Sequence, residues 1–540
     1  MNHIWYKNAV FYSLDIETFY DANGDGIGDF QGLIQKLDYL SGLGINCIWL
    51  LPFFPSPNRD NGYDVTDYYN IDPRLGTLGD FAEFMDKAGQ LGIRVVIDLV
   101  VNHTSIEHPW FKQAVNDPQS GYFNYYIWSD NPEEHGQIEP MLKGEVDTAW
   151  TYHEKAGKYY LHRFYREQPD LNIANPEVRL EVLRIMGFWL RLGVSGFRVD
   201  AAERIIESYG MTNPGDYNLA CFLEDMREFI SLRKSDAVLL AETNVQPEGM
   251  DTYFRKGERM HMAFNFFVNQ QLFLALAEED GSHLRKAFER QPRLSSQNQW
   301  LNFLRHHDEL SLKLLNDKER QSIYHKFAPD KDMLIFESGI RRRIAPMMQG
   351  NRKHMELAYS LLFSLPGVAM IRYGDEIGMG ENLKLEGRNS VRTPMQWSEA
   401  PHGGFSAANI NKNVPVIEDE VFGFRTVNVR KQQQDGSSFL NWMERLIIAR
   451  KHFPETGYGE ASVIGTPQPE LFIHHFRYHD VAAYFFHNLS SHELVVDLED
   501  LSISYEGLAE IFGNEQSKQQ EKRLVLSAFG YKWFKHKMHK

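Results

Sequence analysis

Cysteine is scarce in this chain of 540 residues: only Cys47 and Cys221 occur, each within an apolar stretch. We therefore expect free, buried thiols rather than a disulfide. No apolar run approaches the roughly 18–20 residues that a membrane-spanning helix requires. The N-terminal residues MNHIWYKNAVFYSLD lack the basic start and unbroken apolar core of a secretory signal. These absences predict a cytoplasmic protein that does not contact membranes.

Basic residues are also fewer than acidic ones. The sequence has 57 Lys and Arg against 73 Asp and Glu, a formal net charge of −16. This balance argues against nucleic acid or an anionic membrane surface as the main partner. Hydrophobic residues make up 43%, which is typical of a folded globular protein. Aromatic residues reach 13%, and their faces suit sugar rings, although they also fill cores. A chain of this length predicts two or three domains.

Eight short apolar runs alternate with helical patterns along the first two thirds of the sequence. The runs cover residues 9–16, 45–52, 94–101, 196–201, 237–242, 261–266, 299–308 and 368–376. Between the first two, Leu33, Leu37, Leu40 and Leu43 recur at three- and four-residue spacing, as on one helix face. Eight strands alternating with helices predict an α/β protein built on a parallel (β/α)8 TIM barrel.

The barrel does not use the whole chain, because such a barrel needs about 250 residues. A polar, aromatic-rich stretch after the third strand predicts an inserted domain at 104–167. From residue 457 onward, short alternating runs predict a C-terminal antiparallel β-sandwich domain at 457–540. The catalytic barrel would then comprise residues 1–103 and 168–456. Residues 311–360 are a candidate cover for the barrel mouth.

Charged side chains follow several of these strands at their carboxyl ends, where the active site of such a barrel lies. They are Asp98 with Asn102 and His103, Arg198 with Asp200, Glu242, and His307 with Asp308. Any one of these acids is more simply explained as a solvated group at a strand end. Four carboxylates from four strands, with a histidine and an arginine, instead predict one catalytic site.

Converging carboxylates without a phosphate-binding loop or a Ser-His pair favour glycoside chemistry. A retaining glycosidase needs a nucleophilic carboxylate and a second carboxyl group about 5 Å away that acts as acid and then base. We expect Arg198 to lower the pKa of neighbouring Asp200 and so keep it ionised. Glu242 follows the apolar run AVLLA, so burial is expected to raise its pKa and keep it protonated.

Four stretches resemble the signature regions of the α-amylase family, glycoside hydrolase family 13. They are DLVVNHTS (98–105), GFRVDAAE (196–203), the acid of LLAET (239–243) and RHHDE (305–309), supported by QPDLN (168–172). The resemblance implies that Asp200 is the nucleophile, Glu242 the acid/base and Asp308 the stabiliser of the transition state. It also implies that the glucose ring at the cleavage site is surrounded by His103, Arg198 and His307.

Further stretches are most similar to the trehalose synthases of that family, including DANGDGIGDFQGL, NGYDVTDY, GIRRRIAP and VRTPMQW. This resemblance implies that Tyr63, Asp64 and Arg392 close the pocket, leaving room for one glucosyl unit and hence for disaccharides. Ala201, directly after the nucleophile, resembles members that act on α-1,4 or α-1,1 bonds, whereas members that cleave α-1,6 bonds commonly have valine there. A small residue under the barrel rim is the alternative explanation of Ala201.

Two positions depart from the trehalose synthase pattern. His306 stands where asparagine is typical, and Glu203 stands where proline is common, adding an acid on the acceptor side. The expected activity is retaining α-glucosyl transfer that interconverts maltose and trehalose, with side hydrolysis. The rival is an exo-acting α-glucosidase on maltose, sucrose or similar disaccharides. A catalytically silent binding subunit is disfavoured because all three catalytic acids are present. The expected partner is a small disaccharide, and a homodimer stays open.

The N-terminal region contains a candidate metal loop, D-x-N-x-D-G-I-x-D. Oxygen ligands at alternate positions, with glycine at the turn, predict a structural Ca²⁺ or Mg²⁺. The ligands would be Asp21, Asn23, Asp25, Asp29 and the carbonyl of Ile27. Gly32 replaces the glutamate of a complete EF-hand, so an acidic turn is the alternative. A second family-type site would use Asn102, Asp170 and Glu207, next to Arg204.

Overall fold

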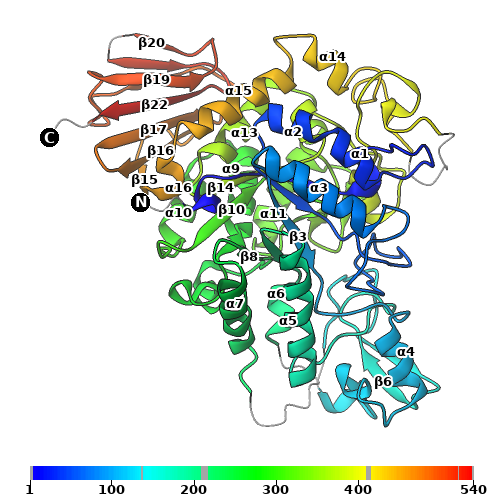
Figure 1. Ribbon diagram of the computed structural model, residues 1–540. Helices are drawn as coiled ribbons and strands as arrows, with labels where there is room; N and C mark the ends of the chain where they lie inside the picture. The colour runs from blue at the N-terminus through cyan, green and yellow to red at the C-terminus, as the bar shows by residue number, and fades with distance from the viewer. Residues whose placement is uncertain (1–3, 136–137, 208–216, 409–414, 521, 538–540) are drawn as a thin grey trace.

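Eight parallel strands close into a barrel in the computed structural model, which describes residues 4–135, 138–207, 217–408, 415–520 and 522–537 (Figure 1). Each strand lies inside one of the eight apolar runs, so the predicted (β/α)8 barrel is confirmed. The strands are β1 (Val10–Leu14), β2 (Cys47–Leu50), β3 (Arg94–Leu99), β7 (Gly196–Val199), β8 (Val238–Ala241), β9 (Met262–Phe264), β10 (Gln299–Phe303) and β14 (Val368–Arg372).

Alternate strand residues fill the barrel interior, as the two-residue period of a strand requires. Phe11, Trp49, Leu240 and Met370 belong to this inner cluster. The outward-facing residues pack against surrounding helices, which include α3 (Leu78–Gln90), α5 (Pro176–Arg191), α7 (Cys221–Arg233), α9 (Phe266–Glu278) and α13 (Arg352–Ser364). Both cysteines are free, as predicted, but only Cys47 is buried, whereas Cys221 is partly exposed.

The first predicted helix forms as two shorter ones, α1 (Phe30–Gln35) and α2 (Leu37–Leu43). Lys36 interrupts them with a non-helical backbone, while the predicted leucines on both sides remain buried. Gly44 ends α2 with φ of 94°, a left-handed conformation that glycine adopts without steric cost. This turn delivers the chain directly into β2.

The inserted segment after β3 forms a small antiparallel sheet at one side of the barrel (Figure 1, cyan). Its strands are β4 (Trp128–Ser129), β5 (Trp150–His153) and β6 (Lys158–Leu161), preceded by α4 (Pro109–Asn116). The sheet lies within the predicted range 104–167. It places residues of the insert beside the carboxyl ends of the barrel strands.

Two antiparallel sheets follow the barrel and form the C-terminal β-sandwich (Figure 1, orange to red). Ile473, Phe486 and Phe534 of one sheet share a buried cluster with Val496 and Leu524 of the other. The five-stranded sheet contains β15 (Glu460–Ile464), β16 (Leu471–Tyr478), β17 (Val481–Asn488), β22 (Tyr531–Lys537) and β19 (Leu508–Gly513). The three-stranded sheet contains β18 (Leu494–Asp497), β21 (Arg523–Leu526) and β20 (Lys518–Gln520).

The segment after β10 reaches the barrel mouth. It forms β11 (Leu310–Ser311), α11 (Asp317–Phe327), β12 (Leu334–Ile335) and β13 (Gly339–Ile340), and Phe336 and Ser338 line the pocket described below. Among the residues described, no helix combines the length and apolar character needed to cross a bilayer.

Candidate active site

A pocket lies at the carboxyl ends of the barrel strands, where the sequence places its acids. Asp200, Glu242 and Asp308 line it from the ends of β7, β8 and β10. The loop after β2 contributes Asp60 and Tyr63, and the loop after β3 contributes His103. The inserted domain adds Met141, Leu142 and Phe164 to the wall. Strands far apart in the chain therefore deliver the three predicted catalytic acids to one cavity.

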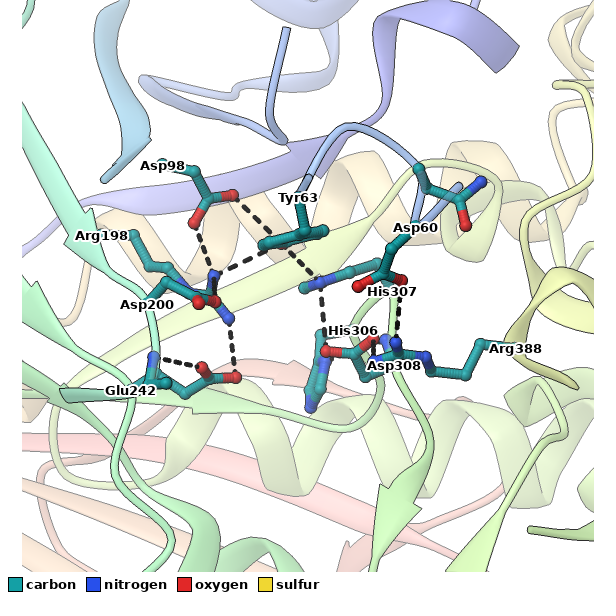
Figure 2. Close-up of polar contacts among 12 residues, drawn as sticks. Asp60, Tyr63, Asp98, Arg198, Asp200, Glu242, His306, His307, Asp308 and Arg388 are labelled. Atoms are coloured by element: carbon teal, nitrogen blue, oxygen red, sulfur yellow. Dashed lines mark hydrogen bonds and ion pairs between the residues drawn. The ribbon is translucent and has the colours of Figure 1, made fainter. Parts of the chain in front are cut away.

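Arg198 does not line the pocket, but it joins Asp98 to the two pocket-lining carboxylates Asp200 and Glu242 (Figure 2). Its Nη1 lies 2.6 Å from Oδ1 of Asp98 and 2.6 Å from Oδ1 of Asp200, and its Nη2 lies 2.6 Å from Oε1 of Glu242. The side chain is 1% exposed and its guanidinium lies over the ring of Trp49. One buried cation thus orients acids from three successive barrel strands.

The two proposed reacting carboxyl groups both have raised pKa values. Burial raises the pKa of Glu242 to about 7, and the negative charges of Asp200 and Asp308 add to the rise while Arg198 opposes it. This agrees with the predicted direction. Burial also raises the pKa of Asp200, because the desolvation of this carboxyl outweighs the attraction of Arg198. The predicted lowering of the Asp200 pKa was therefore wrong in its net direction, although Arg198 acts as expected.

Ala201 helps to orient Glu242. Its backbone has φ of 45°, a left-handed conformation that is strained for a residue with a side chain. In that conformation its N–H donates to Oε2 of Glu242 at 3.1 Å. Nothing in the local sequence signals this conformation, because left-handed backbone is usually expected at glycine or asparagine.

Asp308 is held by three groups (Figure 2). Its Oδ1 accepts from Nη1 of Arg388 at 2.6 Å and from Nη2 of Arg392 at 2.7 Å, and its Oδ2 lies 3.1 Å from Nε2 of His307. Burial alone would raise the pKa of Asp308, but the Arg388 charge, followed by His307 and Arg392, lowers it well below its ordinary value. Asp308 is therefore kept as a carboxylate.

The two histidines before Asp308 have different positions. Burial lowers the pKa of His307 to about 3, and its Nε2 lies 2.7 Å from the hydroxyl of Tyr63, behind the pocket wall. His306 lines the pocket itself, and burial lowers its pKa well below its ordinary value. The N–H of Asp308 donates to Nδ1 of His306 at 3.1 Å. A neutral His306 therefore has its proton on Nε2.

Comparison with known proteins agrees with this geometry. The family model described as "Alpha amylase, catalytic domain" matches residues 16–459. The chain belongs to the α-amylase family. A trehalose synthase from Pimelobacter sp. (strain R48) is 41% identical over 477 residues, covering 86% of this chain and 83% of that protein. An oligo-1,6-glucosidase from Parageobacillus thermoglucosidasius is 32% identical over 513 residues, covering 87% and 88%. The crystal structure of an α-amylase from H. orenii superposes with a TM-score of 0.80 at 27% identity, covering 98% of this chain and all of that one.

In this α-amylase-family pocket, one end differs from the sequence-based expectation. Asp64 does not line the pocket: its carboxylate accepts from the hydroxyl of Ser56 at 2.8 Å and from the N–H groups of Arg59 and Asp60 at 3.2 Å each. Its carboxylate instead stabilises its own loop through these three hydrogen bonds.

Asp60 and Arg388 form the part of the pocket wall that Asp64 and Arg392 were expected to form. Oδ1 of Asp60 lies 3.1 Å from Nη2 of Arg388, and both residues line the pocket. Arg392 supports this wall from behind, donating from Nε to the carbonyl of His307 at 3.0 Å and binding Asp308 as described. The available signals were that Asp60 is the first acid of DNGYD and that Arg388 lies four residues before Arg392.

Glu203 lies on the rim of the pocket. Its Oε1 accepts the backbone N–H of Asn244, and its Oε2 lies 3.8 Å from Nη2 of Arg204 and 4.0 Å from Nζ of Lys313. Asn244, Lys313 and Ser311 line the same part of the pocket. This polar rim has the hydrogen-bonding groups that a second sugar would need.

The N-terminal metal loop has carboxylates around a tight turn. Asp21 accepts from the N–H groups of Gly24 at 2.7 Å and Gly26 at 2.8 Å, and Asp25 accepts from the N–H of Ile27 at 2.8 Å. Asp29 accepts from the N–H groups of Ala22 and Asn23 and caps α1 at Gly32. Oδ2 of Asp21, which also accepts from the hydroxyl of Ser406, and Oδ2 of Asp29 each accept two hydrogen bonds. Oδ1 of Asp21, Oδ1 of Asp29 and both oxygens of Asp25 accept one each and so retain a lone pair that a hard cation could use.

The second expected metal site contains an arginine. Asn102, Asp170 and Glu207 do come together, but the guanidinium of Arg163 lies among their oxygens. A cation cannot occupy the same volume, so the expectation of a metal at this point was wrong.

Proposed function

We propose that this protein interconverts maltose and trehalose by retaining α-glucosyl transfer, with hydrolysis as a side reaction. The observation that carries the proposal is the pairing of Asp200 and Glu242 on the two terminal nitrogens of Arg198, inside a pocket walled by Asp60 and Arg388. Relatives that are 39–41% identical over 86% of this chain are trehalose synthases. Together these findings support an α-glucoside as substrate and a double displacement as mechanism.

The first step forms a covalent glucosyl–enzyme. The carboxylate of Asp200 attacks the anomeric carbon of the glucosyl unit, and the bond from that carbon to the bridging oxygen breaks. Glu242, protonated because burial raises its pKa to about 7, gives its proton to the departing oxygen. A glucose molecule is released into the pocket, and the glucosyl unit remains bound to Asp200 as an ester.

The second step decides the product. Glu242, now a carboxylate, takes a proton from the attacking hydroxyl, which displaces Asp200 from the anomeric carbon. Attack by the 1-hydroxyl of the retained glucose gives trehalose, attack by its 4-hydroxyl restores maltose, and attack by water gives hydrolysis. Two inversions keep the α configuration. The polar rim of Glu203, Asn244 and Lys313 is where we place the retained glucose.

The remaining pocket groups hold the glucosyl unit. Asp308, kept ionised by Arg388, His307 and Arg392, can accept hydrogen bonds from sugar hydroxyls as the ring distorts toward the transition state. The ion pair between Asp60 and Arg388 lies in the pocket lining, and we place the end of the glucosyl unit that faces away from the retained glucose against it. This placement favours a single glucosyl unit and therefore disaccharides over long chains.

The alternative is an exo-acting α-glucosidase, which the 32% identity to an oligo-1,6-glucosidase supports less strongly than the trehalose synthases support isomerisation. Incubating the protein with maltose and separating the products distinguishes them. We expect trehalose to accumulate with a smaller amount of free glucose. Glucose as the sole product would overturn the isomerase assignment, and full activity in Asp200→Ala would overturn the mechanism.

We also propose that the loop of Asp21, Asn23, Asp25, Ile27 and Asp29 holds a structural Ca²⁺ or Mg²⁺, and that the enzyme acts on a small disaccharide in the cytoplasm. The oxygen donors around the glycine turn support the first part. Chelation with EDTA, which binds both Ca²⁺ and Mg²⁺, should lower the Tm of the wild type, and Asp21→Asn should remove that response. An unchanged Tm would favour the metal-free acidic turn.

A further inference from the structure

Arg163 lies at the junction between the inserted domain and the barrel and is only 2% exposed. Its Nε lies 2.5 Å from Oδ2 of Asp170, its Nη1 lies 2.9 Å from Oε2 of Glu207, and its Nη2 lies 2.8 Å from Oδ1 of Asn102. Both terminal nitrogens also lie 3.3 Å from the carbonyl oxygen of Arg204. One guanidinium is therefore surrounded by oxygens from four residues.

The surrounding oxygens are the kind that bind a hard divalent cation. Two carboxylates, one amide oxygen and one peptide carbonyl make an all-oxygen set, which is typical of calcium. The charges also balance without a metal. Asp170 and Glu207 contribute two negative charges, Arg163 contributes one positive charge, and the Arg204 side chain contributes the second by pairing with Oε1 of Glu207 at 2.5 Å.

We propose that Arg163 takes the place of a divalent cation at this junction, and that the site becomes a calcium site when its side chain is removed. The site itself is defined by Asn102, Asp170, Glu207 and the carbonyl of Arg204, and we call it the Arg163 cradle. This inference does not depend on the proposed function, because it concerns only the groups of the cradle.

The cradle connects to the pocket on two sides, which gives Arg163 a positioning role. The amide nitrogen of Asn102 lies 3.2 Å from Nδ1 of His103, which lines the pocket. Arg204 lies in the short helix α6 (Ala202–Ile205), which follows Asp200 and Ala201. Contacts to the Arg204 carbonyl therefore fix the backbone just after Asp200, the proposed nucleophile. A covalently attached cation does this at any calcium concentration, because it cannot dissociate.

The test is an Arg163→Ala variant compared with the wild type in EGTA and in millimolar calcium. In EGTA, two buried carboxylates lose their central cation, so the Tm should fall by about 5–10 °C. Calcium should restore at least half of that loss, and calorimetry should detect one more bound calcium per chain than in the wild type. The wild type measured in parallel accounts for any calcium bound by the N-terminal loop.

Arg163→Ala combined with Asp170→Asn is the matched control, because it removes one carboxylate ligand and should abolish the added calcium response. Recovery of folded Arg163→Ala only from calcium-containing medium would also support the proposal. Arg163→Lys keeps a positive charge in the cradle and should neither gain a calcium nor lose as much Tm as Arg163→Ala. The proposal is overturned if Arg163→Ala binds no more calcium than the wild type, or if Arg163→Lys gains a calcium. The proposal is also overturned if Arg163→Ala does not fold even in millimolar calcium, because the added calcium should replace the missing cation.

Discussion

The backbone N–H of Ala201 donates to Oε2 of Glu242 at 3.1 Å, from a left-handed conformation with φ of 45°. The residue after the proposed nucleophile thus orients the proposed acid/base. The donor is a backbone N–H. A substitution of Ala201 can therefore change this contact only through the backbone conformation or through the bulk at the Cβ atom.

Ala201→Val should therefore impair the enzyme on maltose. A β-branched residue in left-handed backbone costs about 1–3 kcal/mol, and Ala201 also lines the pocket. We expect kcat/KM for maltose to fall by about tenfold and activity on the α-1,6 substrate isomaltose to fall less. Ala201→Gly is the control, because glycine keeps the N–H and relieves the strain. Equal losses in both variants would show that side-chain bulk at this position does not select the bond.

Glu242 should determine the alkaline side of the pH profile. Burial raises its pKa to about 7, and the first step needs its proton, so kcat/KM for maltose should fall as pH rises through about 7. Glucosyl fluoride is the control substrate, because fluoride departs without protonation and its first step should not show that fall. A maltose profile that is flat from about pH 6 to 8 would contradict the assignment.

The same group should make stability depend on pH. Because the pKa of Glu242 is higher in the folded protein than its ordinary value of 4.5, the folded state holds the proton more tightly. This contribution to the free energy of unfolding is complete below about pH 4.5 and is lost as pH rises through about 7. Glu242→Gln cannot titrate, so between those pH values its Tm should decline less than that of the wild type. Parallel declines would contradict the raised pKa.

Asp60 and Asp64 should respond differently to the same substitution. Asp60→Asn removes the charge that pairs with Arg388 in the pocket, and losing a charged hydrogen bond of about 1.5–3 kcal/mol lowers kcat/KM by about 10- to 100-fold. Asp64→Asn weakens the contacts that stabilise its own loop, so we expect a lower Tm with a smaller change in kcat/KM. A large loss of kcat/KM in Asp64→Asn, with a small one in Asp60→Asn, would instead indicate that Asp64 belongs to the pocket wall.

This pair also illustrates what the sequence could and could not predict. The convergence of Arg198, Asp200 and Glu242 could be predicted from the sequence. Each lies at the carboxyl end of a barrel strand, and all those strand ends face the same mouth of the barrel. The choice between Asp60 and Asp64 depends on the path of an irregular loop, which has no such period. The partner of Asp170 is equally hidden, because Arg163 reaches it across a domain junction.

His306 either only supports Asp308 or also affects the competition between water and the retained glucose, and substitution can separate these two roles. Its Nδ1 accepts the N–H of Asp308, and its ring contacts Phe266 and Phe303 while lining the pocket. In His306→Asn, the asparagine oxygen can still accept the N–H two residues later, so Asp308 should keep its position. The shorter side chain leaves space that water can enter beside the apolar rings.

We therefore expect His306→Asn to consume maltose at a rate close to the wild type but to release more glucose. The glucose-to-trehalose ratio should rise by about two- to tenfold, which corresponds to ~0.4–1.4 kcal/mol between the two competing transition states. His306→Ala is the comparison, because it also loses the acceptor for the Asp308 N–H and should slow total turnover. An unchanged product ratio in His306→Asn would mean that His306 only supports Asp308, and that the fate of the retained glucose is decided at the rim by Glu203, Asn244 and Lys313.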